Sequence, residues 1–203
     1  MHYPEFFKSI PSMTLHDPLA DILGACQDGL ITYGYLDAVK LTGHSCPTVA
    51  GAYLMALKGL AILYPDSQPV RGEIAVKLKE KKEHTVTGVV ANVLSFITGA
   101  SDAGGFKGVD GRYSRNGLLT FGADIAASVS LRRTDTKMTV LLDYNPAVLG
   151  LPAVDASLMK RVIGGTASER EADAFTLQWQ ENVKTVFKKK ETAGLVSARL
   201  QAD

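Results

Sequence analysis

The longest apolar stretch of the chain covers residues 48–63 and mixes small residues such as Ala50 with larger ones such as Leu60. Pro47 precedes it, and proline is favoured in the first turn of a helix because its missing N–H has no intrahelical partner there. Ser45 is a suitable N-cap just before this proline. The pattern therefore predicts one long buried helix that begins near Pro47.

Alternation of apolar and polar residues predicts several strands. It is clearest over residues 71–79 and 138–144, short over 118–121 and partial over 123–131. Residues 134–136 form a turn, so the two runs that flank them are expected to make a hairpin. Ile31, Tyr33 and Tyr35 also alternate, which predicts a short strand that leads into the loop around residue 44. Residues 87–97 are an apolar run that fits a strand or a buried helix, since periodicity does not separate the two.

Helix signals recur at both ends of the chain. Asp17 and Pro18 are a good N-cap and first helical residue, so we expect a short helix that ends before Gly29. Residues 153–163 and 167–188 have the spacing of amphipathic helices, and residues 195–203 are expected to be a frayed end. The pattern predicts an α+β fold in which a mixed or antiparallel sheet packs against the long helix. We expect a core at 1–150 and a helical extension at 151–203 that packs on the core or on a partner subunit.

Composition narrows the class of protein. The 203 residues are 46% hydrophobic and 21% charged, which is ordinary for a globular protein. A net charge of +1 gives no reason to expect nucleic-acid binding, and no apolar run is long enough for a membrane span. The amino-terminal residues lack the apolar core of a signal peptide, so we expect a cytoplasmic protein. Its two cysteines, Cys26 and Cys46, are then reduced, and they cannot form a zinc ribbon.

The candidate chemistry lies at the start of the predicted long helix. Cys46 would sit at the helix amino terminus, where the helix dipole favours a thiolate, and His44 lies two residues earlier. An imidazole and a thiolate together are half of a metal site, or a nucleophile with its base. His84 falls in a charged turn, and we expect it to take no part.

A second candidate is the glycine-rich segment 98–111, which holds five glycines in fourteen residues. Glycine lets a backbone approach a ligand closely, but the segment lacks the Gly-Lys-[Ser/Thr] ending of a phosphate-binding P-loop. It is a ligand-lining loop or a long surface turn. The residues expected to line a ligand are Thr98, Gly99, Ser101, Asp102, Gly104 and Gly105.

The segment Gly43-His44-Ser45-Cys46-Pro47, followed by a helix of small residues, resembles the FmdE family, which takes its name from a component of formylmethanofuran dehydrogenase. A second similar block, residues 93–99, reads as an apolar strand that leads into a Thr-Gly turn, and the resemblance covers about residues 17–144. It implies an α+β core, an intertwined homodimer and a metal bound near the His–Cys pair. Many relatives have a cysteine where this chain has Ala100. A further ligand is therefore needed, and His16 is the candidate because it too precedes a helix, with Asp17 or Asp102 as alternatives.

Three functional hypotheses follow. In the first, His44, Cys46 and His16 bind a transition metal at a catalytic or sensory site. Zn²⁺ suits nitrogen and sulfur ligands most readily, and Ni²⁺, copper and haem iron are alternatives. In the second, a metal-free enzyme or binder uses Cys46 as a thiolate activated by His44. The glycine-rich loop would cradle its small-molecule ligand, with Arg71, Lys107, Arg112 or Arg115 as anion contacts. In the third, His44 and Cys46 only satisfy each other in the core.

Overall fold

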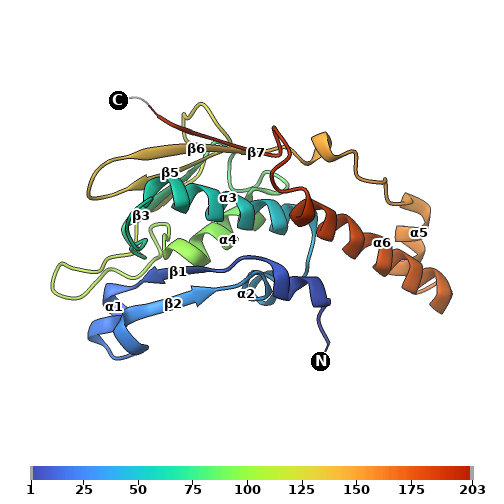
Figure 1. Ribbon diagram of the computed structural model, residues 1–203, viewed down its shortest axis with the longest axis horizontal. Coiled ribbons are helices and arrows are strands. Elements are labelled where there is room, and N and C mark those ends of the chain that lie inside the picture. The colour runs from blue at the N-terminus through green and yellow to red at the C-terminus, as the bar shows by residue number, and fades with distance from the viewer. Residues whose placement is uncertain (1, 202–203) are drawn as a thin grey trace.

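A long helix, α3 (Pro47–Leu63), runs through the middle of the molecule (Figure 1). The computed structural model describes residues 2–201, and most residues of α3 are buried in it, Ala52, Tyr53 and Ala56 completely. This confirms the long buried helix that the apolar stretch predicts. The N-cap is Cys46 rather than Ser45, because the Cys46 sulfur accepts the backbone N–H of Val49.

A five-stranded mixed sheet covers α3 on one side, in the order β4-β3-β5-β6-β7. Only β3 and β4 pair in parallel, and the other neighbours are antiparallel. Val76, Leu131 and Val140 are fully buried on the face that meets the helix. Gly59 of α3 lies directly against Leu131 and Leu142. The α+β fold expected from the sequence is therefore present. The strands are β3 (Ile74–Leu78), β4 (Leu119–Thr120), β5 (Val129–Arg133), β6 (Thr139–Tyr144) and β7 (Val196–Leu200).

A small two-stranded sheet lies on the other side of α3 and pairs β1 (Met13–His16) with β2 (Leu30–Tyr33). The predicted strand through Tyr35 is corrected here, because β2 ends at Tyr33 and Tyr35 begins a helix. Gly34 caps that helix, and its N–H donates to the carboxylate of Asp37. The remaining elements of this part are η1 (Glu5–Ser9), α1 (Pro18–Ile22), η2 (Gln27–Gly29) and α2 (Tyr35–Thr42).

The ambiguous apolar run is a helix, α4 (Thr87–Thr98), which packs on α3, α2 and β3. It ends at Gly99, whose φ of 76° is the left-handed conformation that glycine adopts without strain. The block 93–99, expected to be a strand before a Thr-Gly turn, is therefore the last part of a helix and its C-cap. Helix α4 is twelve residues long, and its buried residues, among them Ala91, Val93 and Leu94, lie on more than one face of the helix.

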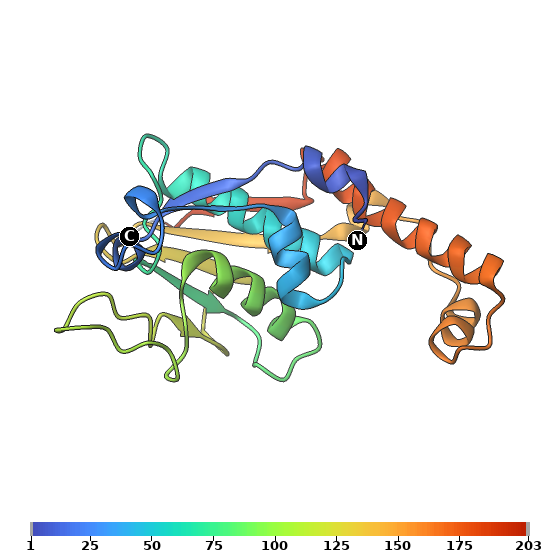
Figure 2. The ribbon, with the colours of Figure 1, turned by 90° about the horizontal axis from the view of Figure 1, so that it is seen from below.

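The segment after residue 150 contributes to the same core. η3 (Pro146–Leu149) lies just before this segment, which contains α5 (Ala156–Ile163) and α6 (Glu169–Lys188). The second half of α6 packs on α3 and buries Val183 and Val186, while its first half projects from the body together with α5 (Figure 2). The expectation of a frayed end at 195–203 is wrong over β7, which pairs with β6 along five residues. Residues 202–203 of that expected end lie outside the described range.

Two further expectations concern membrane-spanning helices and the state of the cysteines. Among the described residues, no helix combines the length and the apolar character that a membrane crossing requires. Cys26 and Cys46 are both free thiols.

Candidate functional site

Cys46 lies where the chain turns sharply from α2 into α3. Gly43 ends α2 with a φ of 74°, and its N–H donates to the carbonyl of Val39. Three residues later Cys46 caps α3, with its sulfur 3.4 Å from the backbone nitrogen of Val49. The cysteine is only 9% exposed. The sequence-predicted position of a thiol at the amino terminus of a long helix is therefore what the structure has.

His44 lies on the same turn but faces the solvent. Its Nδ1 is 2.9 Å from the carbonyl oxygen of Thr42. Because a carbonyl oxygen only accepts hydrogen bonds, Nδ1 carries the hydrogen, and Nε2 of the neutral ring keeps its lone pair. In the described part of the chain no hydrogen bond joins this imidazole to the sulfur of Cys46. The two side chains share a loop without touching through a polar contact.

Two tyrosines, Tyr35 and Tyr144, lie close enough to Cys46 to interact with its charge. The Tyr35 hydroxyl is 2.9 Å from the Ser45 hydroxyl, whereas the Tyr144 hydroxyl is buried and finds no hydrogen-bond partner within residues 2–201. Burial raises the pKa of both tyrosines, the bond to Ser45 offsets part of this for Tyr35, and negative charge on Cys46 raises both further. The thiol and the two phenols are therefore electrostatic neighbours.

Helix α6 covers this turn from outside. The indole Nε1 of Trp179 donates to the backbone carbonyl of Ser45 at 2.8 Å, and the amide nitrogen of Gln180 lies 3.5 Å from the same oxygen. The amide oxygen of Gln180 is buried without a partner in the described chain. With the Tyr144 hydroxyl, this makes two unsatisfied polar atoms around the loop of Cys46. Such atoms are uncommon in folded proteins and point to a water or ligand that pairs with them.

A cavity of about 420 Å³ adjoins this cluster between α3, the start of α4 and the ends of β5 and β6. Tyr144 lines it and is an electrostatic neighbour of Cys46, which is not itself among the lining residues. His84, which the sequence suggested would take no part, also lines it. Sequence patterns gave no signal for Tyr144 or Gln180. The lining residues are Thr48, Met55, Leu78, Glu80, His84, Val86, Thr87, Val90, Ser128, Val129, Tyr144 and Pro146.

His16, the third predicted metal ligand, lies elsewhere. It ends β1 directly before α1, with its Nε2 3.6 Å from the carboxylate of Asp21. Figure 1 shows α1 at one end of the molecule and α6 at the other. Over residues 2–201, no three histidine, cysteine, aspartate or glutamate side chains gather in a group that could hold a metal ion. Of the predicted ligands, the structure brings only His44 and Cys46 into one loop.

The glycine-rich loop is also far from Cys46, at the end of the molecule opposite α6 in both views (Figures 1 and 2). The loop is held by its own bonds: the Asp102 carboxylate accepts the Gly104 N–H at 2.9 Å and lies 3.6 Å from Lys82 Nζ. Thr98 is buried and donates to the Leu94 carbonyl. Gly99 packs beside two arginines, and Ser101 and Gly105 pack against each other. None of these predicted ligand-lining residues borders the 420 Å³ cavity.

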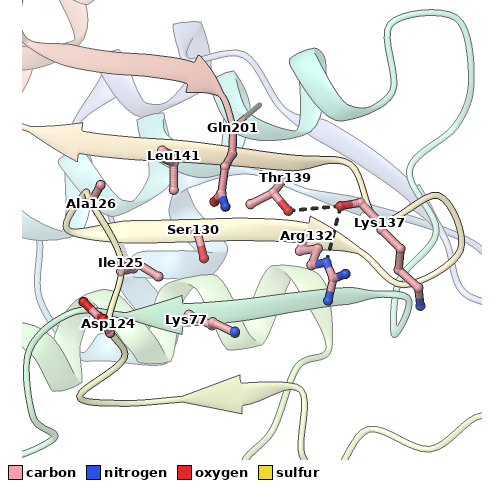
Figure 3. Close-up of a pocket in the computed structure, with 10 residues that line it drawn as sticks. All are labelled: Lys77, Asp124, Ile125, Ala126, Ser130, Arg132, Lys137, Thr139, Leu141 and Gln201. Atoms are coloured by element: carbon pink, nitrogen blue, oxygen red, sulfur yellow. Dashed lines mark hydrogen bonds between the residues drawn. The ribbon is translucent and has the colours of Figure 1, made fainter. Parts of the chain in front are cut away.

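A larger hollow of about 650 Å³ lies on the outer face of the five-stranded sheet (Figure 3). Strand side chains such as Lys77 and Ser130 line it, and the segment with Asp124 closes one side. Arg132 and Thr139 both donate to the carbonyl of Lys137 there. The lining contains no cysteine or histidine, so it offers neither a thiol nucleophile nor a sulfur or imidazole ligand for a soft metal. The loop of Cys46 offers both.

Comparison with known proteins gives no assignment: no protein-family model matches the chain, and no curated protein matches it.

Proposed function

We propose that this chain binds a small molecule beside Cys46 and that the Cys46 sulfur reacts with it. One observation carries the proposal: the sulfur, held by the Val49 N–H at the start of α3, is an electrostatic neighbour of Tyr144, which lines the cavity and whose hydroxyl has no partner within residues 2–201. The helix start thus places a backbone N–H donor directly against the sulfur. The arrangement therefore combines a nucleophile, a hydroxyl able to donate and a space for a ligand.

The cavity supports a ligand of moderate size and largely apolar character. Its volume of about 420 Å³ lies within the usual range of small-molecule sites. Met55, Val90 and Val129 supply apolar walls, while Thr48 and His84 supply polar groups that could orient a ligand. We infer a ligand with an electrophilic centre near the Tyr144 end of the cavity.

Alkylation of the native protein tests the nucleophile. Iodoacetamide forms a sulfur–carbon bond and releases iodide, and the added mass locates the modified cysteine. We expect Cys46 to react faster than Cys26 at neutral pH, although Cys46 is the more buried thiol. Cys26 is a matched reference, because its side chain caps no helix. Single variants Cys26→Ser and Cys46→Ser separate the two rates. A Cys46 that reacts only after denaturation would contradict the proposal.

Fragments that carry a chloroacetamide test the cavity. We expect a subset to modify Cys46 faster than their intrinsic reactivity predicts. Val90→Phe should fill part of the cavity and abolish this selectivity, while iodoacetamide labelling is retained because the reagent is small. Leu177→Phe, on the exposed face of α6, is the control with the same added ring. Equal effects of both substitutions would count against a ligand in the cavity.

Metal binding at His44 and Cys46 is the second candidate, and the orientation of His44 favours it. Metal-ligating histidines usually donate their other ring N–H to a carbonyl or carboxylate, as His44 does to Thr42. The resemblance to the FmdE family implies a homodimer, and we propose a second copy or water as the source of further ligands. Zn²⁺ is the expected ion, with Ni²⁺, copper or haem iron as alternatives.

Metal analysis of protein purified without a histidine tag tests this candidate. We expect bound zinc in the wild type and its loss in His44→Ala and in Cys46→Ser. His16→Ala should retain the metal, because His16 lies at the α1 end of the chain. Light scattering with and without zinc measures the proposed dimer. A wild-type protein that binds none of these metals would refute the candidate and leave the thiol proposal standing.

A further inference from the structure

A buried arginine, Arg115, and a half-buried one, Arg71, share one carboxylate at the end of the molecule away from Cys46. Asp17 Oδ2 accepts Arg71 Nη1 at 2.9 Å, and Asp17 Oδ1 accepts Arg115 Nη2 at 2.6 Å. Asp17 is 3% exposed and Arg115 is 6% exposed. The same carboxylate also caps α1 through the backbone nitrogens of Leu19 and Ala20. One negative charge thus faces two positive charges, and a buried charge without compensation is costly.

Both arginines also keep donors without partners. Arg115 Nη1 and Arg71 Nε are buried and make no hydrogen bond within the described residues. The Arg115 backbone fixes this placement, because its N–H donates to Phe106 and its carbonyl accepts the N–H of Ser101. The unpaired guanidinium edge is therefore a built feature of the fold and not the end of a mobile surface side chain.

Two glycines pack directly against this edge. A Cβ at Gly72 would lie 1.5 Å from Arg115 Nη1, and one at Gly99 would lie 2.9 Å from it. Gly72 has a φ of 87° and Gly99 a φ of 76°, which L side chains rarely adopt. No side chain at either position can fill the space beside the guanidinium group.

A cavity of about 150 Å³ opens at this place. The residues that line it are Pro18, Arg71, Gly72, Glu73, Arg112, Tyr113, Ser114 and Arg115. A water molecule occupies about 30 Å³ in the liquid, so the cavity has room for a small polyatomic ion. In the described chain Glu73 makes no hydrogen bond to the three arginines. With Asp17 included, the charged groups here leave a net charge of +1.

We propose that this cavity binds a phosphate group, held by the free edge of Arg115 together with Arg71 and Arg112. The planar fork of a guanidinium group pairs with two oxygens of a phosphate, and the ion would satisfy the orphaned nitrogens and balance the extra charge. This inference goes beyond the proposed function, since the cavity shares no lining residue with the one beside Tyr144.

Calorimetric titration of the full chain with inorganic phosphate, at constant ionic strength, tests the proposal. We expect one phosphate per chain, and a loss of affinity of about tenfold in Arg115→Lys and in Arg112→Ala. Arg170→Ala removes the same charge from an exposed position on α6 and should leave the affinity unchanged. Acetate is the second probe, because a carboxylate offers the same pairing to a guanidinium fork.

Arg112→Ala keeps the test decisive if Arg115→Lys does not fold, because Arg112 is exposed and makes no bond to Asp17. Absence of saturable phosphate binding in the wild type overturns the proposal. Equal weakening by Arg170→Ala reduces it to general charge attraction. Acetate binding tighter than phosphate binding reassigns the cavity to a carboxylate. Alkylation of Cys46 is unaffected by any of these results, so the two sites are tested separately.

Discussion

Gly51 of α3 and the ring of Tyr144 lie in contact, so that a Cβ at position 51 would be 2.3 Å from the ring carbon Cε1. Glycine in a helix interior is less favourable than alanine by about 1 kcal/mol. The contact explains why glycine is present there. It brings the ring against the first half of α3, the helix that Cys46 caps.

Gly51→Ala should therefore destabilise the protein, although alanine is the better helix former. Overpacking against an aromatic ring costs about 1–3 kcal/mol, which outweighs the helix propensity that is gained. Urea unfolding measures the difference. Gly88→Ala in α4 is the matched control: nothing lies within 4 Å of its added Cβ, so we expect a gain of up to about 1 kcal/mol. A gain in both variants would show that the ring is not packed as described.

Tyr144→Phe should change stability by less than about 0.5 kcal/mol, or increase it, because its buried hydroxyl has no hydrogen-bond partner among residues 2–201 to lose. Tyr53→Phe removes a hydroxyl bonded to the carbonyls of Pro11 and Tyr33, and should cost about 1–2 kcal/mol. The free energy of unfolding of both variants is the measurement. If the two substitutions cost the same, the Tyr144 hydroxyl has a partner in solution, and a bound water or ligand is the first candidate.

The carboxylate of Asp17 leads us to expect that the free energy of unfolding falls at acidic pH. Burial alone would raise its pKa, but the bonds from Arg71 and the Ala20 N–H, with the charge of Arg115, bring the pKa below its usual value. A group with a lowered pKa stabilises the fold above the pKa of the unfolded chain, about 3.9, and this contribution is lost as pH falls further. Unfolding in urea between about pH 7 and pH 3 should show this loss.

Asp17→Asn keeps an oxygen for the helix cap but leaves two guanidinium groups without a counter-charge. We expect it to cost about 3–5 kcal/mol at neutral pH, with the deficit shrinking below about pH 4. Asp135→Asn is the control: that carboxylate is exposed, its bond to Arg133 lowers its pKa to about 2, and its removal should cost under about 1 kcal/mol. Similar deficits in the two variants would contradict the buried cluster.

Trp179 is the only tryptophan of the chain, and its indole donates to the carbonyl of Ser45, the residue before Cys46. A group attached to Cys46 should disturb this bond and shift the indole emission. We expect the shift on alkylation of the Cys26→Ser variant and none on alkylation of Cys46→Ser. An unchanged spectrum after complete modification of Cys46 would show that α6 does not report on the site.

Local sequence signals account for much of the framework. Pro47 and the apolar residues after it define α3, and alternation over 138–144 defines β6. The strand predicted through Tyr35 fails because both Tyr33 and Tyr35 are buried, one on a strand and the other on a helix. Gly34 between them begins the helix through a capping bond to Asp37, which alternation does not reveal. Where two elements meet at a single residue, periodicity continues across the boundary.

The sequence predicts two residues of the candidate site and misses two others. Cys46 and His44 lie at a helix start, which proline and glycine mark in the sequence. Tyr144 and Gln180 come from distant segments and reach Cys46 only through the packing of β6 and α6 on α3. A glycine such as Gly51 inside a helix signals close packing without naming the partner. His16 and His44 both precede a helix in the sequence. That local position does not indicate whether the two helix starts lie close together in the fold.

Strand β7 completes the sheet only after α5 and α6 have been made, since it follows both in the chain. While the ribosome is still producing these helices, the backbone of β6 on that side has no neighbour, and it remains open to strands of other chains. A shortened product that stops before Val196 would keep this edge permanently. Solubility should therefore depend on five residues that contribute nothing to either cavity.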